Sequence, residues 1–278
     1  MGDYGPGVSS LGVQTPADPP LSASDPEEIS VLLTGFGPFK SNLVNASYLI
    51  ASSLPPSFTF TPTTSDGADA APRKVSIHVH PAPIPVAYSS VQAMLPVIIG
   101  DFVKAHGGRR PDLIIHMGIA AMRNYYSVET KAHRDAYLMS DIKGKPGYED
   151  GERLWRELDL PPVLQPGPSE DSAIVPGALS SKKAHLTPRV PDADFLIAWE
   201  KFCPRQTDVR ISTDAGRYLC EFIFYASLAL AYQEGQDRSI VFFHVPASCL
   251  DDDIEAGKDV AIALIKALAT RWGSPSKA

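Results

Sequence analysis

The chain has 278 residues, of which 44% are hydrophobic and 21% charged, so it is long enough to bury a substantial core. Its formal net charge of −7 argues against a nucleic-acid-binding protein, because such proteins derive affinity from lysine and arginine contacts to phosphates. No apolar run approaches the roughly 18 residues of a membrane span. The three irregularly spaced cysteines indicate neither a disulfide framework nor a zinc cluster, so we expect a cytoplasmic protein with reduced thiols.

Residues 1–28 are rich in Gly, Pro, Ser and Asp, which predicts a flexible N-terminal tail. Residues 29–278 are predicted to form a single α/β domain with loop insertions near 55–73 and 145–195. Apolar patterns and capping signals predict, in chain order, a strand at 29–36, a helix at 45–54, a strand at 74–84, a helix at 86–108, a strand at 111–120, a β-like segment at 125–133, helices at 194–202 and 217–233, a strand at 239–246 and a helix at 253–272.

The alternation of strands and helices, with several strands apolar throughout, predicts a three-layer α/β/α sandwich around a mostly parallel twisted sheet. Ligands of such sheets bind at the carboxyl ends of the strands. The segments TGFGPF (34–39), HMGIA (116–120) and FFHVP (242–246) each lie at such an end. We therefore expect them to converge on one site.

Cys220 lies near the start of the long apolar helix, in DAGRYLCEF, with Thr213 or Asp214 as the expected N-cap. A helix N-terminus favours the thiolate, which is the nucleophilic form of cysteine. A small buried hydrophobe is the alternative, since cysteine often packs in cores. His244 ends an apolar strand 24 residues later and is a candidate general base, or a core histidine bonded to a carbonyl. Glu129 is a candidate for orienting that imidazole, although most glutamates are solvated.

The segment TGFGPF does not match a nucleotide-binding loop. The residue after its second glycine is Pro38, which removes a backbone donor, and no third glycine follows in register. Two phenylalanines at a strand end suit a flat, mostly apolar ligand, and the alternative is that both rings are core. His78 and His80 share a strand face without an apparent third ligand, so no metal site is expected.

Four groups of motifs, in this order, resemble the pyroglutamyl peptidase type I family of cysteine peptidases. They are VLLTGFGPF with VNAS, PDLIIHMGIA with SVE, STDAGRYLCEFIFY, and FFHVP. The resemblance runs from residue 30 to 272 and excludes the two insertions.

The resemblance implies an α/β/α sandwich that removes an N-terminal pyroglutamyl residue from peptides, without a metal or cofactor. It implies a catalytic triad of Cys220, His244 and Glu129. It also implies that Phe36 and Phe39 hold the lactam ring, and it adds Tyr218 to the substrate-binding residues. Neither a nucleic-acid nor a membrane partner is expected, and the oligomeric state stays open.

The chain departs from the bacterial members of that family at three positions. Glu221 stands where they have asparagine, Met139 where they have an arginine near the oxyanion, and Ile119 where they have glutamine. Two other functions remain as alternatives. One is another amidase or acyl-transfer reaction on the same scaffold, and the other is a paralogue that only binds its ligand.

Overall fold

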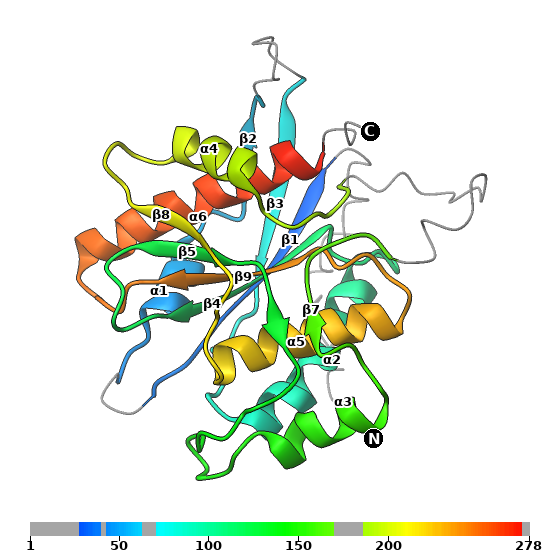
Figure 1. Cartoon of the computed structure of the whole chain (residues 1–278). Coiled ribbons are helices and arrows are strands. Elements are labelled where there is room, and N and C mark those ends of the chain that lie inside the picture. The colour runs from blue at the N-terminus through cyan, green and yellow to red at the C-terminus, as the bar shows by residue number, and fades with distance from the viewer. Residues whose placement is uncertain (1–27, 40–42, 63–70, 170–185, 274–278) are drawn as a thin grey trace, which may run out of the picture.

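The computed structural model describes residues 28–39, 43–62, 71–169 and 186–273. A seven-stranded sheet lies at the centre of the molecule (Figure 1). Its strands, from one edge to the other, are β2 (Ser57–Phe60), β3 (Arg73–Val79), β1 (Ile29–Gly35), β4 (Leu113–Ile119), β9 (Ile240–Val245), β5 (Tyr126–Glu129) and β8 (Val209–Ser212). A small second sheet pairs β6 (Ala132–His133) with β7 (Val163–Leu164).

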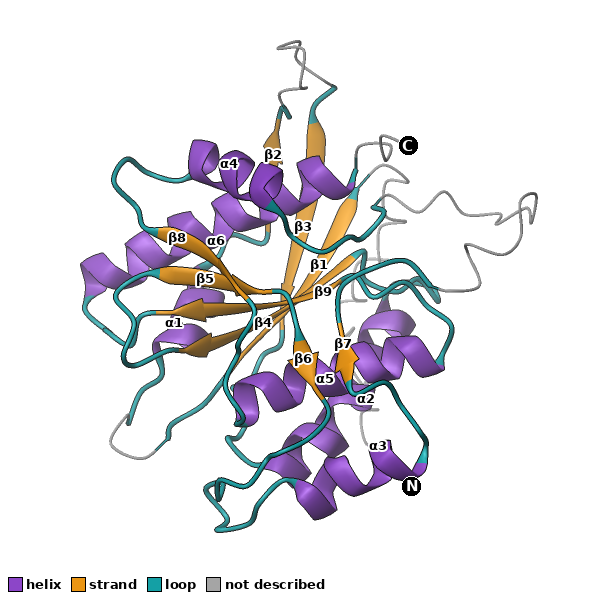
Figure 2. Ribbon diagram, in the orientation of Figure 1, coloured by secondary structure: helices purple, strands orange, loops and turns teal. Residues whose placement is uncertain are grey.

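Helices cover both faces of the large sheet, which confirms the predicted three-layer sandwich (Figure 2). One face is covered by α1 (Ala46–Ser53), α4 (Ala193–Phe202) and α6 (Asp251–Trp272). The other is covered by α2 (Tyr88–Ala105) and α5 (Leu219–Gln233). The π-helical turn η1 (Tyr148–Glu152) and α3 (Arg153–Glu157) lie outside α2 and α5. No helix among these is both long and apolar enough to cross a membrane.

The sheet is mostly parallel, as predicted. The pairs β1–β3, β1–β4, β4–β9 and β5–β8 are parallel, whereas β2–β3 and β5–β9 are antiparallel. Since β1, β4 and β9 run in the same direction, the segments TGFGPF, HMGIA and FFHVP do share one edge of the sheet. Strand β5 begins at that edge and runs antiparallel to β9, so its residues pair with the carboxyl end of β9.

Successive residues of the central strands point to opposite faces and divide the interior into two cores. In β1, Val31 and Leu33 are buried on the face covered by α6, while Leu32 and Phe36 are buried on the face covered by α5. The same alternation places Phe242 and His244 of β9 on the α5 face. The face that receives α5 therefore also receives the polar residues at the strand ends.

Two sequence expectations need correction. The segment 55–73 is predicted as a loop, yet Ser57–Phe60 pairs with β3 because Phe60 packs into the core. The segment 145–195 likewise contains η1 and α3, and Trp155 is 3% exposed against Phe222 of α5. The predicted tail at 1–28 lies outside the described residues except for Glu28, which pairs with Lys74.

Other boundaries agree closely with prediction. Asn45 caps α1, as the sequence indicates, and its side chain accepts a hydrogen bond from Ser47 N. The helix α2 continues through Pro96. The expected N-cap of α5 is wrong: Asp214 Oδ1 accepts from Gly216 N in a turn, and Gly216 has φ +77°, so the chain enters the helix only after Tyr218.

Gly35, at the end of β1, is the contact point between this strand and α1. A Cβ at this position would lie 2.7 Å from Tyr48 Cα and 2.9 Å from Ser47 O, both backbone atoms of α1. Gly35→Ala should therefore push α1 away and lower the free energy of unfolding by about 1–3 kcal/mol. Gly100→Ala is the control, because its Cβ would meet nothing within 4 Å and alanine is the better helix former. Urea denaturation of both variants measures the difference, and equal stability would contradict the packing described.

Candidate active site

Cys220 is the second residue of α5, and its side chain meets the sheet at Gly118 of β4. A Cβ on residue 118 would lie 2.9 Å from Cys220 Sγ and 2.7 Å from the ring of Phe242. Only glycine leaves room for the sulfur at this point. Gly118 pairs in register with His244 of β9, so the thiol lies beside the strand that carries the histidine.

His244 and Glu129 form a buried hydrogen-bonded pair on adjacent strands. His244 Nδ1 lies 2.8 Å from Glu129 Oε1, and the residues are 4% and 0% exposed. In the antiparallel β5–β9 register Glu129 stands opposite Phe242, two residues before His244 on the same face. A carboxylate only accepts, so Nδ1–H donates and Nε2 is the nitrogen left to receive a proton.

Arg123 and Ser127 complete the surroundings of Glu129. Arg123 Nη1 lies 2.8 Å from Glu129 Oε1 and also donates to Ser127 Oγ at 2.8 Å, while Ser127 Oγ donates to the same carboxylate oxygen at 3.2 Å. Arg123 Nη2 donates to the carbonyl of Asp214, in the loop that leads to Cys220. This guanidinium therefore links the acid to the segment that carries the thiol.

Arg123 was missed in the sequence because nothing in the turn before β5 distinguishes it from an exposed arginine. The only signal was its place in a short turn that ends at a strand with a candidate acid. Its hydrogen bond to the Asp214 carbonyl depends on where the loop between β8 and α5 lies in the folded chain. Only the tertiary structure shows this contact.

The electrostatics keep Glu129 ionised and Cys220 protonated. Burial alone would raise the pKa of Glu129, but hydrogen bonds from His244, Ser212 and Arg123, with the charge of His244, outweigh burial and lower it. Burial raises the pKa of the Cys220 thiol to about 12, and the nearby charge of Glu129 adds to this effect. Burial of the sulfur thus acts against the thiolate that the sequence predicts at the helix N-terminus.

Three aromatic rings cluster near the N-terminus of α5, which carries Cys220. The ring of Phe39 lies 5.2 Å from that of Tyr218, which directly precedes the first residue of α5, and Tyr88 of α2 lies 5.9 Å from Tyr218. Phe39 and Tyr218 are partly buried, whereas Phe36 is 4% exposed within the core on the same face. The sequence missed Tyr88, whose hydroxyl donates to the Met139 carbonyl at 3.0 Å.

His116 is a further buried polar residue on this face of β4. Its Nδ1 lies 2.8 Å from Thr34 Oγ1 of the neighbouring strand β1, and burial lowers its pKa to about 3. The imidazole is therefore neutral and ties β4 to β1. It lies two residues before Gly118, so this tie fixes the strand against which the sulfur rests.

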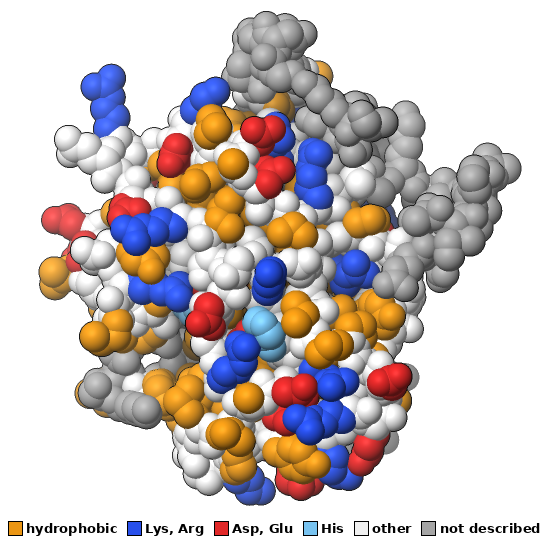
Figure 3. Space-filling view, in the orientation of Figure 1, with side chains coloured by type: hydrophobic (Ala, Val, Ile, Leu, Met, Phe, Trp, Pro, Cys, Tyr) orange, Lys and Arg blue, Asp and Glu red, His pale blue; other side chains and the backbone are white. Residues whose placement is uncertain are grey.

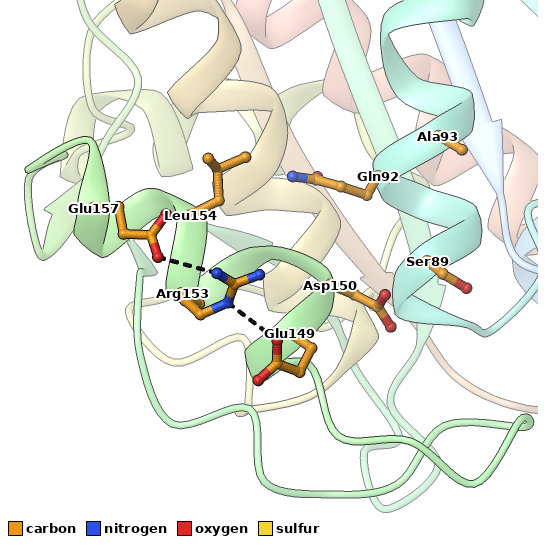
Figure 4. Close-up of a pocket in the computed structure, with 8 residues that line it drawn as sticks. All are labelled: Ser89, Gln92, Ala93, Glu149, Asp150, Arg153, Leu154 and Glu157. Atoms are coloured by element: carbon orange, nitrogen blue, oxygen red, sulfur yellow. Dashed lines mark hydrogen bonds and ion pairs between the residues drawn. The ribbon is translucent and has the colours of Figure 1, made fainter.

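Two other features lie apart from these residues. An open pocket of about 450 Å3 lies between α2 and η1–α3, where Arg153 bridges Glu149 and Glu157 (Figure 4). Neither Cys220 nor His244 lines it. Among the described residues no cluster of histidine, cysteine, aspartate or glutamate is arranged to hold a metal ion. His78 instead packs edge-on against the rings of Phe102 and His106.

Comparison with known proteins places the chain in context. No family model matches it. The pyroglutamyl-peptidase 1 of Mus musculus is 28% identical over 218 residues, which cover 78% of each chain. The pyrrolidone-carboxylate peptidase of Pyrococcus furiosus is 26% identical over 218 residues, covering 78% of this chain and 81% of that protein.

Two solved structures have the same fold. The pyrrolidone carboxyl peptidase of Thermococcus litoralis gives a TM-score of 0.55 at 17% identity, over 87% of this chain and 96% of that one. The pyroglutamyl peptidase I of Bacillus amyloliquefaciens gives 0.54 at 20% identity, over 87% and 97%. The chain therefore has the same α/β/α fold as these two peptidases. In sequence it is similar to curated proteins named as pyroglutamyl or pyrrolidone-carboxylate peptidases.

The raised pKa of Cys220 predicts the pH dependence of its alkylation. Below a pKa of about 12 the thiolate fraction grows about tenfold per pH unit, so the iodoacetamide rate should rise that steeply from about pH 7 to 10. The measurement uses a chain with Cys203→Ser and Cys249→Ser, so that only Cys220 reacts. A plateau near neutral pH would instead indicate a preformed thiolate–imidazolium pair.

Proposed function

We propose that this chain is a cysteine peptidase that removes an N-terminal pyroglutamyl residue from peptides, with Cys220, His244 and Glu129 as its catalytic residues. The observation that carries the proposal is the contact of the Cys220 sulfur with Gly118, directly beside the buried His244–Glu129 pair. The family supports the substrate, since its relatives are named as pyroglutamyl or pyrrolidone-carboxylate peptidases.

The first step is nucleophilic attack by Cys220 Sγ on the carbonyl carbon of the pyroglutamyl residue. The thiol proton passes to His244 Nε2 during the attack, because the thiol is protonated at rest. Glu129 stabilises the imidazolium through Nδ1–H. The N–H groups in the first turn of α5 have no acceptor within the helix, and we assign them to the oxyanion.

The second half of the reaction returns the proton. His244 gives it to the leaving amine as the peptide bond breaks, which leaves a thioester between Cys220 and the pyroglutamyl group. Water then loses a proton to His244 and attacks the thioester, and the thiol re-forms as pyroglutamate departs. No cofactor enters this sequence. The thiol chemistry suits a reducing compartment, so we propose that the enzyme works in the cytoplasm.

Phe36, Phe39 and Tyr218 are proposed to bind the lactam ring. Pyroglutamate is small, flat and uncharged, so aromatic stacking and a few backbone hydrogen bonds are sufficient to select it. The partly buried rings of Phe39 and Tyr218 flank the entry to Cys220. Phe36 is buried in the core on the same face, and we propose that it contacts the ring from below.

A panel of fluorogenic amides tests the function. The protein should release the fluorophore from the pyroglutamyl amide and not from the matching prolyl or glutamyl amides. Cys220→Ser should abolish release, whereas Cys203→Ser and Cys249→Ser should leave it unchanged. Turnover of another acyl amide would favour the amidase alternative, and pyroglutamate binding without turnover would favour a binding paralogue.

The aromatic residues give a second test. Phe39→Ala should reduce kcat/KM at least about tenfold, because stacking and buried area are both lost. Its melting temperature should change little, since the ring is partly exposed. Phe36→Ala should lower both, because truncating a buried phenylalanine costs about 3–5 kcal/mol. Kinetics and melting are measured on the same samples, and unaltered kinetics in Phe39→Ala would remove this residue from the proposed pocket.

A further inference from the structure

A second buried acid–imidazole pair lies directly behind the nucleophile. Glu221 follows Cys220 in α5, and its side chain is 0% exposed. Its Oε1 accepts from His133 Nδ1 at 2.7 Å and from His133 N at 3.2 Å. Its Oε2 accepts from Arg217 Nη1 at 2.5 Å. Every close partner named here is a donor, so the carboxylate is compensated although it is buried.

This carboxylate is unfavourable for the chemistry beside it. A negative charge one residue from Cys220 opposes the developing thiolate, and it contributes to raising the pKa of that thiol. Burial in turn raises the pKa of Glu221 itself, although His133 and Arg217 act against this. A neutral helix-forming residue at this position would neither raise the pKa of Cys220 nor bury a carboxylate. The contribution of Glu221 therefore lies in its hydrogen bonds.

The contacts of His133 indicate what that contribution is. His133 belongs to β6, and its carbonyl accepts from the hydroxyl of Tyr137. Tyr137 is fully buried and packs against Tyr88 and Phe222. The chain then continues to Met139 and Ser140, whose carbonyls accept from the hydroxyls of Tyr88 at 3.0 Å and Tyr218 at 3.2 Å.

These contacts form a chain of hydrogen bonds that begins and ends near the first turn of α5, beside the proposed substrate site. It starts at the residue after Cys220, runs through His133 and Tyr137 to the segment 136–141, and returns through Tyr218 to the residues before Cys220. Ala136 within this segment has φ +78°, and both Ala136 N and Tyr137 N donate to the buried Glu152. Glu152 and the Tyr137–His133 contact thus hold the start of the segment, and the hydroxyls of Tyr88 and Tyr218 hold its later part.

We propose that Glu221 and His133 are positioning residues that fix the pocket wall formed by Tyr218 and residues 136–141, at the expense of nucleophile reactivity. This inference rests on the proposed function for the identity of the pocket. It also connects two of the three departures from the bacterial pattern, those at Glu221 and Met139. The carboxylate at Glu221 holds the very segment in which Met139 replaces an arginine.

The effect of Glu221 on the thiol depends on the other charged and titratable groups around Cys220. The charged and titratable groups that face it are Glu129 from β5, Arg123 from the turn before β5, His244 from β9, Tyr88 from α2, and Tyr218 and Glu221 from α5. Acidic and basic side chains also alternate near β6 on the face drawn in Figure 3. Removing the negative charge of Glu221 from this set leaves Arg123 less opposed, which favours the thiolate.

Two substitutions separate positioning from charge. Glu221→Gln should raise KM at least about threefold, as expected for the loss of one hydrogen bond to a charged group. It should also speed alkylation of Cys220 at about pH 8 by at least about threefold, which corresponds to about half a pKa unit. His133→Ala should raise KM similarly but should not speed alkylation, because the carboxylate stays. His133→Asn, which keeps a donor near Nδ1, should restore KM.

Glu234→Gln is the matched control, since it removes an arginine-paired carboxylate just past the opposite end of α5 and should change neither quantity. A folded Glu221→Gln protein with KM and alkylation within twofold of the parent would overturn the inference, as would faster alkylation in His133→Ala. If Glu221→Gln does not fold, the KM values of His133→Ala and His133→Asn decide the positioning role. Alkylation of Cys220 can be measured without turnover. If the proposed function is wrong, the parent protein will be inactive on the pyroglutamyl amide, yet Glu221→Gln will still speed the alkylation of Cys220.

Discussion

The first turn of α5 reaches the sheet only because residue 118 has no side chain. Any Cβ there would collide with the sulfur of Cys220 and the ring of Phe242. This close approach sets the thiol beside β9, within the layer where His244 and Glu129 are already bonded. The same approach buries much of the sulfur and so raises the pKa of the Cys220 thiol, while the residue as a whole stays partly exposed. Reactivity and packing are thus consequences of one contact.

The two buried carboxylates near this contact are each paired with basic side chains. Glu129 is matched by Arg123 and His244, and Glu221 by Arg217 and His133. Breaking one partner of such a pair leaves an uncompensated charge, which is far more costly than the pair is stabilising. The two histidine pairs, His244–Glu129 and His133–Glu221, also join segments distant in sequence, whereas the two arginines lie near their acids in the chain. The site is therefore held by the same interactions that neutralise its acids.

The sequence predicted the layers, most element positions and the three strand ends that converge. Period-2 and helical patterns are strong in long apolar runs such as Ile240–Val245 and Leu219–Gln233, so those elements were clear. The short strand Ser57–Phe60 and the α3 region were missed because their burial depends on partners far along the chain. The residues of the candidate triad were named from the strand ends and from family resemblance, and the hydrogen bond between two of them was not visible in sequence.

By itself the sequence determined which residue types stand at the edge of the sheet: a thiol at a helix start, an imidazole at a strand end and an acid nearby. These follow from local pattern, which fixes where each strand and helix stops. Only the tertiary structure decided that β5 runs antiparallel to β9, which brings Glu129 onto His244, and that Arg123 and His133 close around the two acids. Strand direction and side-chain burial depend on contacts between distant segments, and so does the raised pKa of the Cys220 thiol, because burial is its main cause.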